Sequence, residues 1–408
     1  MYDHILVALD GSEPSRLAGQ IAVALAAATS ARLTACHVYG AEIHQRRFAE
    51  MEPGLPTKYQ EQDTLSELRT AHDKLIYQGF QALSAGYVED FVKSSRDSGI
   101  VVESVASEGR SYVGILHLAE THRADLIVLG AEGLGVVGNG MLGGTTSRVL
   151  DSARCDVLVA RRALQGGPVL TGVDGSEEAL KAVAKAVAIG RVMDKSLHIV
   201  AAYDPDFHTH VFSAMARSLS PQRQDQVGLA SQEKLHDDII NDGLGKLYRE
   251  FLREAERRFS NDCIALTTFL VTGKVYCALD LQAGDSDADL IVVNRHGLHR
   301  QSCSRLGSNA EGLIRTTSTN VLLVGGVDDE SSGPKHMSDS AKITTVAQPL
   351  VWDSDAEARL LRVPSFVRRM ARRAVENAVR ELGKNRVSAE DFASVAAHFG
   401  MGGRKDNT

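Results

Sequence analysis

The chain has 408 residues, of which 43% are hydrophobic and 24% are charged, and this composition excludes collagen-like, coiled-coil and wholly disordered proteins. Asp and Glu number 52 against 45 Lys and Arg, and a net charge of −7 argues against general binding to nucleic acid or to an anionic membrane. Five cysteines without a Cys-x-x-Cys pair favour reduced thiols, and no apolar run of about 18 residues predicts a membrane-spanning helix. We therefore expect a cytoplasmic protein.

Strand-like and helix-like segments alternate in the first part of the chain. In chain order the expected strands are Ile5–Leu9, Arg32–Val38, Ile100–Ser104, Leu126–Gly130 and Val157–Ala160. The expected helices are Arg16–Ala28, a long helical region over 42–98, Tyr112–His122 and Thr146–Asp151. This alternation predicts a doubly wound parallel sheet of the α/β class, with a long helical insertion.

The whole pattern occurs twice, with an offset of 164 residues. Asp10–Glu13 recurs as Asp174–Glu177, and Ala124–Val128 recurs as Ala288–Val292. A period this long predicts two complete domains, at 1–164 and 165–328, rather than a solenoid. We expect the two domains to pair face to face as an intramolecular pseudo-dimer. Their apolar final strands, Val157–Ala160 and Val321–Val324, are the expected seam because an exposed strand edge invites association.

A different unit follows the second copy. The segment 329–347 is polar and rich in turn residues, which predicts a linker. In the segment 348–402, apolar residues recur every three or four positions from Val363 to Leu382, and Ser388 has the pattern of a helix N-cap. We therefore predict a small, all-helical C-terminal domain.

This segment resembles a known family at Trp352, Ala356, Leu360-Leu361, Val363-Pro364, Phe366–Arg368, Glu376 and Val387-Ser388. The family is the helical domain at the C-terminus of the light-independent protochlorophyllide reductase B subunit. The resemblance implies a small accessory module and does not imply the reductase reaction. We expect this module to attach the chain to a protein partner.

A glycine-rich loop follows the fourth expected strand of each copy. In the first copy its residues are Gly130, Gly133, Gly143, Gly144 and Thr145. Backbone N–H groups at a helix N-terminus can hold an anion, and ligands of open parallel sheets bind beyond the carboxyl ends of the strands. Asp10 ends the first strand at the same edge, where its carboxylate can accept a hydrogen bond from a ribose hydroxyl or an adenine amino group.

The loop pattern Gly-x2-Gly-x9-Gly-Ser/Thr, the strand before it and the early Asp together resemble the universal stress protein family over residues 1–327. The resemblance implies Rossmann-like domains with strand order 3-2-1-4-5 that pair with one another. It also implies, for a subset of members, binding of ATP or a related adenine nucleotide. In this reading Asp10 and Val38 flank the adenine. The ribose and phosphates are surrounded by Gly130, Gly133, Gly143 and Thr145.

Both copies depart from the family pattern. In the first, Gly144 stands where the family has Ser or Thr, and Glu132 brings a negative charge into the loop. In the second, Asn294 replaces the first glycine, whereas Arg295 and His296 favour an anion. The corresponding candidate residues of the second copy are Asp174, Ala202, His296, Gly297, Gly307, Ser308 and Asn309. The first copy thus offers the better backbone and the second the better electrostatics.

Histidines recur in the helical insertions. His44 and His72 of the first copy match His208 and His236 of the second, which adds His210. Two histidines in one helical region can ligate a metal ion or a haem-like cofactor. The alternative is that they lie on helix surfaces or in a packing interface.

These features favour a non-catalytic signalling or stress-response protein that binds an adenine nucleotide and a protein partner. The chain has no Walker A, Gly-x-Ser-x-Gly or His-Glu-x-x-His sequence. One alternative is a slow ATP-hydrolysing or nucleotidyl-transferring enzyme, with Ser308 and His296 near the phosphates. Another is a metal or tetrapyrrole carrier that uses the helical insertions. Self-association of the whole chain as a homodimer is a further option.

Overall fold

The computed structural model describes residues 1–134, 142–260, 264–298, 305–326 and 350–398, except for 364–367, 369–370, 373, 377 and 380–383. The side chains of 206–210, 212, 230–242 and 396–398 are also outside the description. The expected linker at 329–347 therefore lies outside the described residues. The chain divides into one unit of residues 1–204 and 251–328 and a second of residues 205–250 and 329–408.

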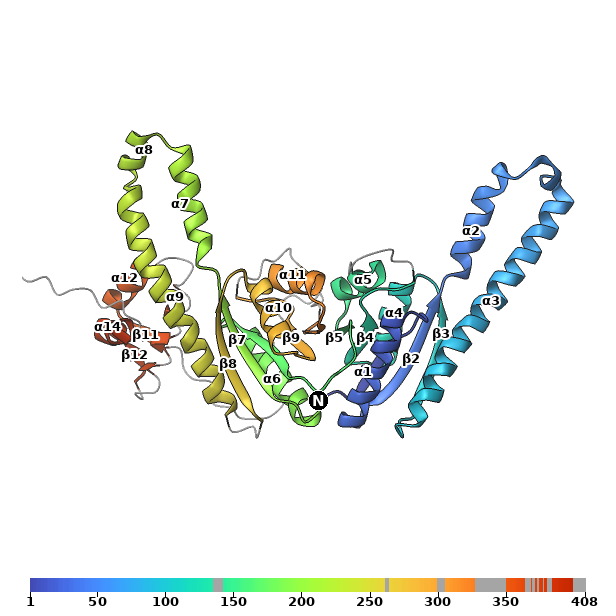
Figure 1. The fold of residues 1–408 in the computed structure, drawn as a ribbon, viewed down its shortest axis with the longest axis horizontal. Coiled ribbons are helices and arrows are strands. Elements are labelled where there is room, and N and C mark those ends of the chain that lie inside the picture. The colour runs from blue at the N-terminus through green and yellow to red at the C-terminus, as the bar shows by residue number, and fades with distance from the viewer. Residues whose placement is uncertain are drawn as a thin grey trace, which may run out of the picture. The chain divides into compact units, whose positions relative to one another are not determined.

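Ten strands form a single sheet in the first unit, in the order β3-β2-β1-β4-β5-β10-β9-β6-β7-β8 (Figure 1). The strands of the first half are β1 (His4–Ala8), β2 (Arg32–Tyr39), β3 (Val102–Glu108), β4 (Leu126–Gly130) and β5 (Asp156–Ala160). Those of the second half are β6 (Val169–Val173), β7 (Leu197–Tyr203), β8 (Leu266–Thr272), β9 (Leu290–Asn294) and β10 (Asn320–Val324). Neighbouring strands are parallel within each half. The predicted strand order 3-2-1-4-5 is thus confirmed in both copies.

Helices follow the strands in the same order in both copies. The first copy contains α1 (Glu13–Thr29), α2 (Ala41–Met51), α3 (Gln62–Arg96), α4 (Ser111–Thr121) and α5 (Gly144–Ser152), with 3-10 turns at Glu52–Gly54 and Thr57–Tyr59. The second contains α6 (Glu177–Val192), α7 (Asp206–Ser218), α8 (Pro221–Gln226), α9 (Leu229–Phe259), α10 (Val275–Asp285) and α11 (Ser308–Thr316). None of the described helices is both long and apolar enough to cross a membrane.

The two copies join through their last strands. β5 and β10 are antiparallel, with Leu158 opposite Leu322, and every residue of both strands is buried. The predicted seam strands are therefore correct, but the expected face-to-face pairing is wrong, since the copies join edge to edge. The reason is that each edge strand carries unpaired N–H and C=O groups, which the antiparallel neighbour satisfies by extending the sheet.

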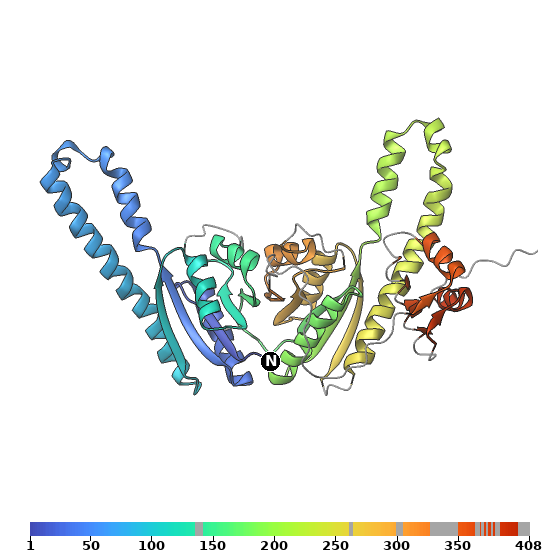
Figure 2. The same cartoon turned by 180° about the vertical axis from the view of Figure 1, so that it is seen from behind.

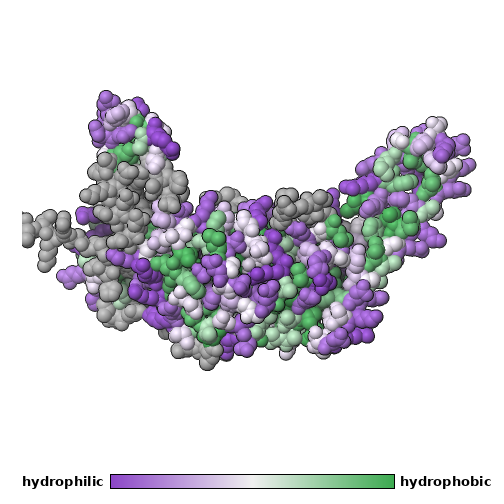
Figure 3. All heavy atoms as spheres, in the orientation of Figure 1, coloured by the Kyte–Doolittle hydropathy of each residue, from purple (hydrophilic) through white to green (hydrophobic). Residues whose placement is uncertain are grey.

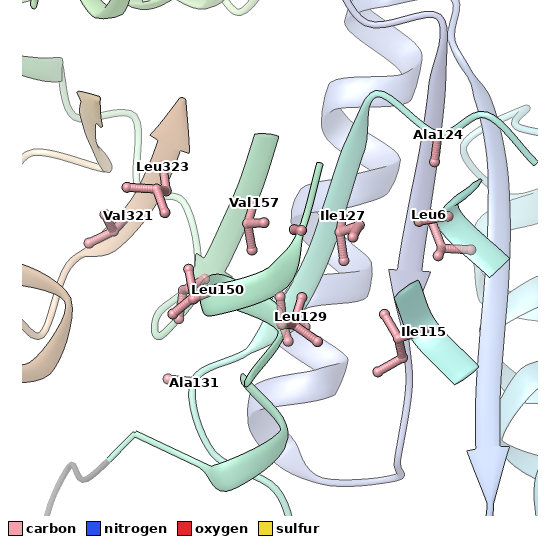
Figure 4. Packing of buried hydrophobic residues seen from close by; sticks show 14 of the residues in the cluster. Leu6, Ile115, Ala124, Ile127, Leu129, Ala131, Leu150, Val157, Val321 and Leu323 are labelled. Atoms are coloured by element: carbon pink, nitrogen blue, oxygen red, sulfur yellow. The ribbon is translucent and has the colours of Figure 1, made fainter. Parts of the chain in front are cut away.

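One hydrophobic core continues across this seam (Figure 4). Leu6, Ile127 and Val157 of the first copy lie in the same cluster as Val321 and Leu323 of the second. Burying one such aliphatic side chain contributes about 1.5–3 kcal/mol, so the shared cluster holds the two copies together.

The helical insertion of the first copy is a hairpin of α2 and α3 (Figures 1 and 2). The second half of α3 packs against β2 and β3. Farther along the hairpin, Met51 and Leu75 are 62% and 69% exposed, and apolar side chains are visible on this surface (Figure 3). The expected helical region over 42–98 is thus two helices. β3 begins and ends later than expected because it pairs with β2 as far as Glu108, opposite Tyr39.

The C-terminal module belongs to the second unit. It contains β11 (Val351–Trp352), α12 (Ser354–Arg362), β12 (Arg386–Val387) and α14 (Ala389–His398). Its core is formed by Ala356, Leu360, Val363, Val375, Val379, Val387 and Phe392. The hydroxyl of Ser388 accepts a hydrogen bond from the Asp391 N–H at 3.2 Å, so the predicted N-cap is confirmed. The module includes a short parallel strand pair as well as helices.

Candidate functional site

A cavity of about 590 Å³ lies beyond the carboxyl ends of β1, β2 and β4 in the first copy. All of the first-copy candidates line it, namely Asp10, Val38, Gly130, Gly133, Gly143, Gly144 and Thr145. Sites for small molecules usually enclose about 300–1,000 Å³, so this cavity is large enough for one nucleotide. The structure thus brings the predicted residues of the first copy around one space, although their role as ligands stays a prediction.

Asp10 is held by the turn between β1 and α1. Its Oδ1 accepts hydrogen bonds from the N–H and the hydroxyl of Ser12, at 3.0 and 2.5 Å. The same Ser12 hydroxyl accepts from the Ser15 N–H and caps α1. Gly11 between them has a φ of +77°, which favours glycine. The recurring Asp-Gly-Ser sequence is therefore a capped turn that fixes a carboxylate at the cavity.

The glycines of the loop serve different purposes. A Cβ at Gly130 would lie 2.7 Å from the backbone of Pro14, and one at Gly133 would lie 2.5 Å from Oδ2 of Asp10. These two glycines therefore let other parts of the protein approach the loop. A Cβ at Gly144 would meet only the end of Arg148, at 3.5 Å. Of Gly130, Gly133 and Gly144, only Gly144 leaves open space at the cavity where its side chain is missing.

One wall of the cavity comes from α3, whose residues were not among the predicted site residues. Phe80, Leu83 and Tyr87 line the cavity from this helix. Their three- and four-residue spacing marks one helix face, and this spacing is the signal that could have identified them. His37 of β2 lies edge-on to Tyr87, with ring centres 5.3 Å apart, and its Nδ1 is 2.7 Å from the Ser84 hydroxyl. Burial lowers the pKa of His37, and the negative charge of Asp10 partly opposes this change.

The equivalent carboxylate of the second copy, that of Asp174, accepts hydrogen bonds with both of its oxygens. Oδ1 of Asp174 accepts from the N–H and hydroxyl of Ser176, and Oδ2 accepts from the Leu298 N–H at 2.9 Å. A Cβ at Gly297 would lie 2.7 Å from that Oδ2, so this glycine is needed for the closed loop. The amide of Asn294 donates to the Glu178 carbonyl, which replaces the close glycine packing of the first copy.

The remaining second-copy candidates lie around the same loop. A Cβ at Gly307 would lie 3.6 Å from Cα of His296 and 3.7 Å from N of Gly297. Ser308 and Asn309 begin α11, and Ala202 is buried near the end of β7. The structure therefore brings these residues to the expected edge of the sheet.

Arg295 does not face the anion loop. Its side chain is directed into the seam, where it donates to the carbonyls of Leu150 and Gly325, and it is only 2% exposed. Leu150 belongs to α5 of the first copy, so Arg295 binds the carboxyl end of the other domain's helix. The expectation that Arg295 favours an anion in the second loop is wrong, because its guanidinium group is buried and hydrogen-bonded to these carbonyls.

The histidines of the first insertion contact aromatic rings. His72 stacks on Phe48 with ring centres 4.3 Å apart, and His44 lies 5.1 Å from the ring of Phe80. These contacts are what the packing alternative predicts. A role for His44 and His72 as metal ligands stays a prediction. The side chains of His208, His210 and His236 lie outside the described residues.

A different group of three ligand-type side chains occurs among the described residues, namely His4, Glu103 and His122. Nδ1 of His4 is 2.7 Å from the carbonyl oxygen of His122, and Nε2 is 2.8 Å from the hydroxyl of Thr34. Both ring nitrogens of the buried His4 are therefore already hydrogen-bonded within the protein.

Comparison with known proteins shows which family the two repeated domains belong to. Residues 1–161 and 167–325 each match the universal stress protein family. The universal stress protein in the QAH/OAS sulfhydrylase 3' region of Thermus aquaticus is 30% identical over 161 residues, which are 40% of this chain and all of that protein. The crystal structure of a universal stress protein from Archaeoglobus fulgidus DSM 4304 covers 79% of this chain and 98% of its own, with a TM-score of 0.52 and 16% identity. The chain belongs to the universal stress protein family and carries two of its domains in tandem.

The C-terminal module has different relatives. Residues 352–395 match the family described as proto-chlorophyllide reductase 57 kD subunit. The B subunit of the light-independent protochlorophyllide reductase from Bradyrhizobium sp. (strain BTAi1 / ATCC BAA-1182) is 42% identical over 57 residues, which are 14% of this chain and 11% of that protein. The chain thus spans about a tenth of that relative, and the similarity concerns one small module.

Proposed function

We propose that this chain is a regulatory protein that binds one adenine nucleotide in the cavity of its first domain. The observation that carries the proposal is the convergence of Asp10, Val38 and the first turn of α5 on a single cavity of about 590 Å³. Asp10 is fixed by its turn with Oδ2 facing the loop, which suits it to accept from a ribose hydroxyl.

The walls of the cavity suit the two ends of a nucleotide. Val38, Phe80 and Tyr87 offer apolar surface to the base, and aromatic rings stack well on such ligands. Thr145 and the N–H groups in the first turn of α5 offer hydrogen bonds and a partial positive charge to the phosphates. Thr145 supplies a hydroxyl beside the position where Gly144 lacks one.

The first domain is the better candidate because its carboxylate, that of Asp10, accepts fewer hydrogen bonds from the described part of the protein. Asp174 uses both carboxylate oxygens within the protein, and the guanidinium group of Arg295 is committed to the seam. The proposed role of the second domain is to hold α5 from its carboxyl end. The C-terminal module, which has its own core, is the proposed contact for a protein partner.

A pair of matched substitutions tests the nucleotide site. Gly144→Leu places a side chain in open space at the cavity. Ser308→Leu places the same side chain at the equivalent helix start of the second domain. We expect ATP binding, measured by calorimetry, to be lost in Gly144→Leu and retained in Ser308→Leu. Loss in Ser308→Leu with retention in Gly144→Leu would move the site to the second domain.

The unaltered chain and the Ser308→Ala variant separate a binding role from a catalytic one. The proposed role is binding without turnover, whereas the alternative enzyme would release phosphate or pyrophosphate steadily from ATP. A steady-state rate that disappears in Ser308→Ala would favour the enzyme.

A further inference from the structure

A second cavity adjoins the first at the start of α5. It has a volume of about 570 Å³ and lies between α2, the junction of β3 and α4, and α5. Ser111, Thr145 and Arg148 line both cavities. The two spaces therefore meet at the first turn of α5, where the phosphates are proposed to bind.

The second cavity is dominated by positive charge. Four arginines line it, namely Arg46, Arg47, Arg110 and Arg148, against two glutamates, Glu42 and Glu50. Within the described part of the chain, Arg46, Arg47 and Arg110 form no ion pair, so their charges are not neutralised by a fixed partner. We call these four arginines and the space between them the arginine pocket.

Two further features favour an anion in the arginine pocket. The N-terminus of α4, an 11-residue helix, lies at the pocket through Arg110 and Ser111. Its first N–H groups and its dipole add to the positive potential. Arg148 lies over the Tyr112 ring at 5.4 Å, which limits the freedom of its side chain.

The second domain lacks this set of charges. The residues at the positions equivalent to Arg46, Arg47, Arg110 and Arg148 are His210, Val211, Lys274 and Gly312. The arginine pocket is therefore a property of the first domain, not of the repeated fold.

We propose that the arginine pocket binds the terminal phosphates of a nucleotide whose base and ribose occupy the first cavity. The ligand class is then adenine nucleotides with three or more phosphates, and the pocket discriminates against AMP. Guanidinium groups pair with phosphate oxygens through charge-assisted, often bidentate hydrogen bonds, which depend strongly on the number of phosphates. This inference rests on the proposed nucleotide site and adds specificity residues on α2 to it.

The test compares ATP, AMP and inorganic tripolyphosphate by calorimetry on the full chain. We expect ATP to bind at least about tenfold more tightly than AMP at low salt, with a difference that shrinks as salt rises. Arg46→Ala/Arg47→Ala should remove this difference by weakening ATP and leaving AMP unchanged. The control Lys74→Ala/Lys93→Ala removes the same charge from exposed positions of α3 outside both cavities, and it should leave the ATP-to-AMP ratio unchanged.

The outcomes separate this inference from the proposed function. Equal affinities for ATP and AMP in the unaltered chain would overturn the role of the arginine pocket and leave the nucleotide site intact. Equal losses of ATP binding in the two double variants would also overturn it, because the effect would then be one of general charge. Absence of binding by both nucleotides and tripolyphosphate would overturn both proposals. Tripolyphosphate binding that the arginine substitutions abolish, without any AMP binding, would support the pocket alone.

Discussion

The carboxylate of Asp156 in the first domain lies 3.1 Å from the ammonium group of Lys185 in the second. The same carboxylate accepts hydrogen bonds from the Gly325 N–H across the seam and from the Tyr2 hydroxyl, both at 2.8 Å. Asn320 is the equivalent residue of the second copy, and its Oδ1 accepts from the Arg161 N–H at 2.8 Å. The first residue of each seam strand thus carries a side-chain oxygen. That oxygen accepts a hydrogen bond from the N–H group of the residue that follows the other seam strand.

This arrangement predicts a graded response at Asp156. Asp156→Asn keeps an acceptor for Gly325, as Asn320 does in its copy, and should cost about 1 kcal/mol through loss of the charge pair. Asp156→Ala leaves the Tyr2 hydroxyl and the Gly325 N–H without a partner, and should cost about 3 kcal/mol. Urea denaturation of both variants measures the difference. Equal losses would show that the hydrogen bonds across the seam contribute little.

Arg295 should contribute to stability rather than to anion binding. Arg295→Met leaves the carbonyls of Leu150 and Gly325 without their donor and should lower the free energy of unfolding by about 2–4 kcal/mol. Arg305→Met, at an exposed position, is the control and should change it by less than about 0.5 kcal/mol. A binding defect in Arg295→Met without loss of stability would contradict the assignment.

Stability should fall in mild acid. Burial lowers the pKa of His4, His37 and His198 below 6.5. The unfolded chain therefore takes up protons below pH 6.5 that the folded chain does not, and the folded state loses stability until the folded pKa values are reached. The slope is at most about 1.4 kcal/mol per pH unit for each histidine that stays neutral. Denaturant unfolding between pH 8 and pH 5 measures it.

The contribution of His4 can be isolated. His4→Gln should flatten the decline below pH 6.5, whereas His117→Gln, at an exposed position of α4, should leave it unchanged. An unchanged slope in His4→Gln would show that His4 does not remain neutral in the folded protein.

Two glycines with similar φ angles separate backbone strain from steric conflict. Gly99 has a φ of +71° with open space around the position of a Cβ, so Gly99→Ala should cost about 1 kcal/mol. Gly11 has a φ of +77°, and a Cβ there would lie 2.4 Å from the Tyr87 ring. Gly11→Ala should therefore cost more, and it should weaken nucleotide binding because the ring is pushed from the wall of the cavity. Thermal unfolding and calorimetry of both variants test this, and equal effects would contradict the role of Tyr87.

Much of the fold follows from local sequence patterns. The alternating segments predict a doubly wound parallel sheet, and the resemblance to the universal stress protein family implies its strand order. The apolar runs at 157–160 and 321–324 predict the seam because an exposed strand edge invites association. Asp10 and the loop glycines could be placed together because parallel strands end at one edge of the sheet, whereas Val38 was placed beside them by the family resemblance.

The features that the sequence did not predict depend on contacts between segments that are distant in the sequence. Tyr87 reaches the cavity only because α3 folds back onto β2; the spacing of Phe80, Leu83 and Tyr87 marks one helix face but does not specify where that face packs. Arg295 follows its strand in an anion-binding pattern, yet the pairing of the two domains buries it against Leu150. At Gly130 the close approach of Pro14, rather than of a ligand, requires the missing side chain.

In the proposed function the first domain alone holds the nucleotide. The most direct measurement is the stoichiometry of ATP binding to the full chain by calorimetry at low salt. We expect one ATP per chain, and we expect Gly144→Leu to abolish that site. Two equivalent sites per chain, or one site that persists in Gly144→Leu, would contradict it.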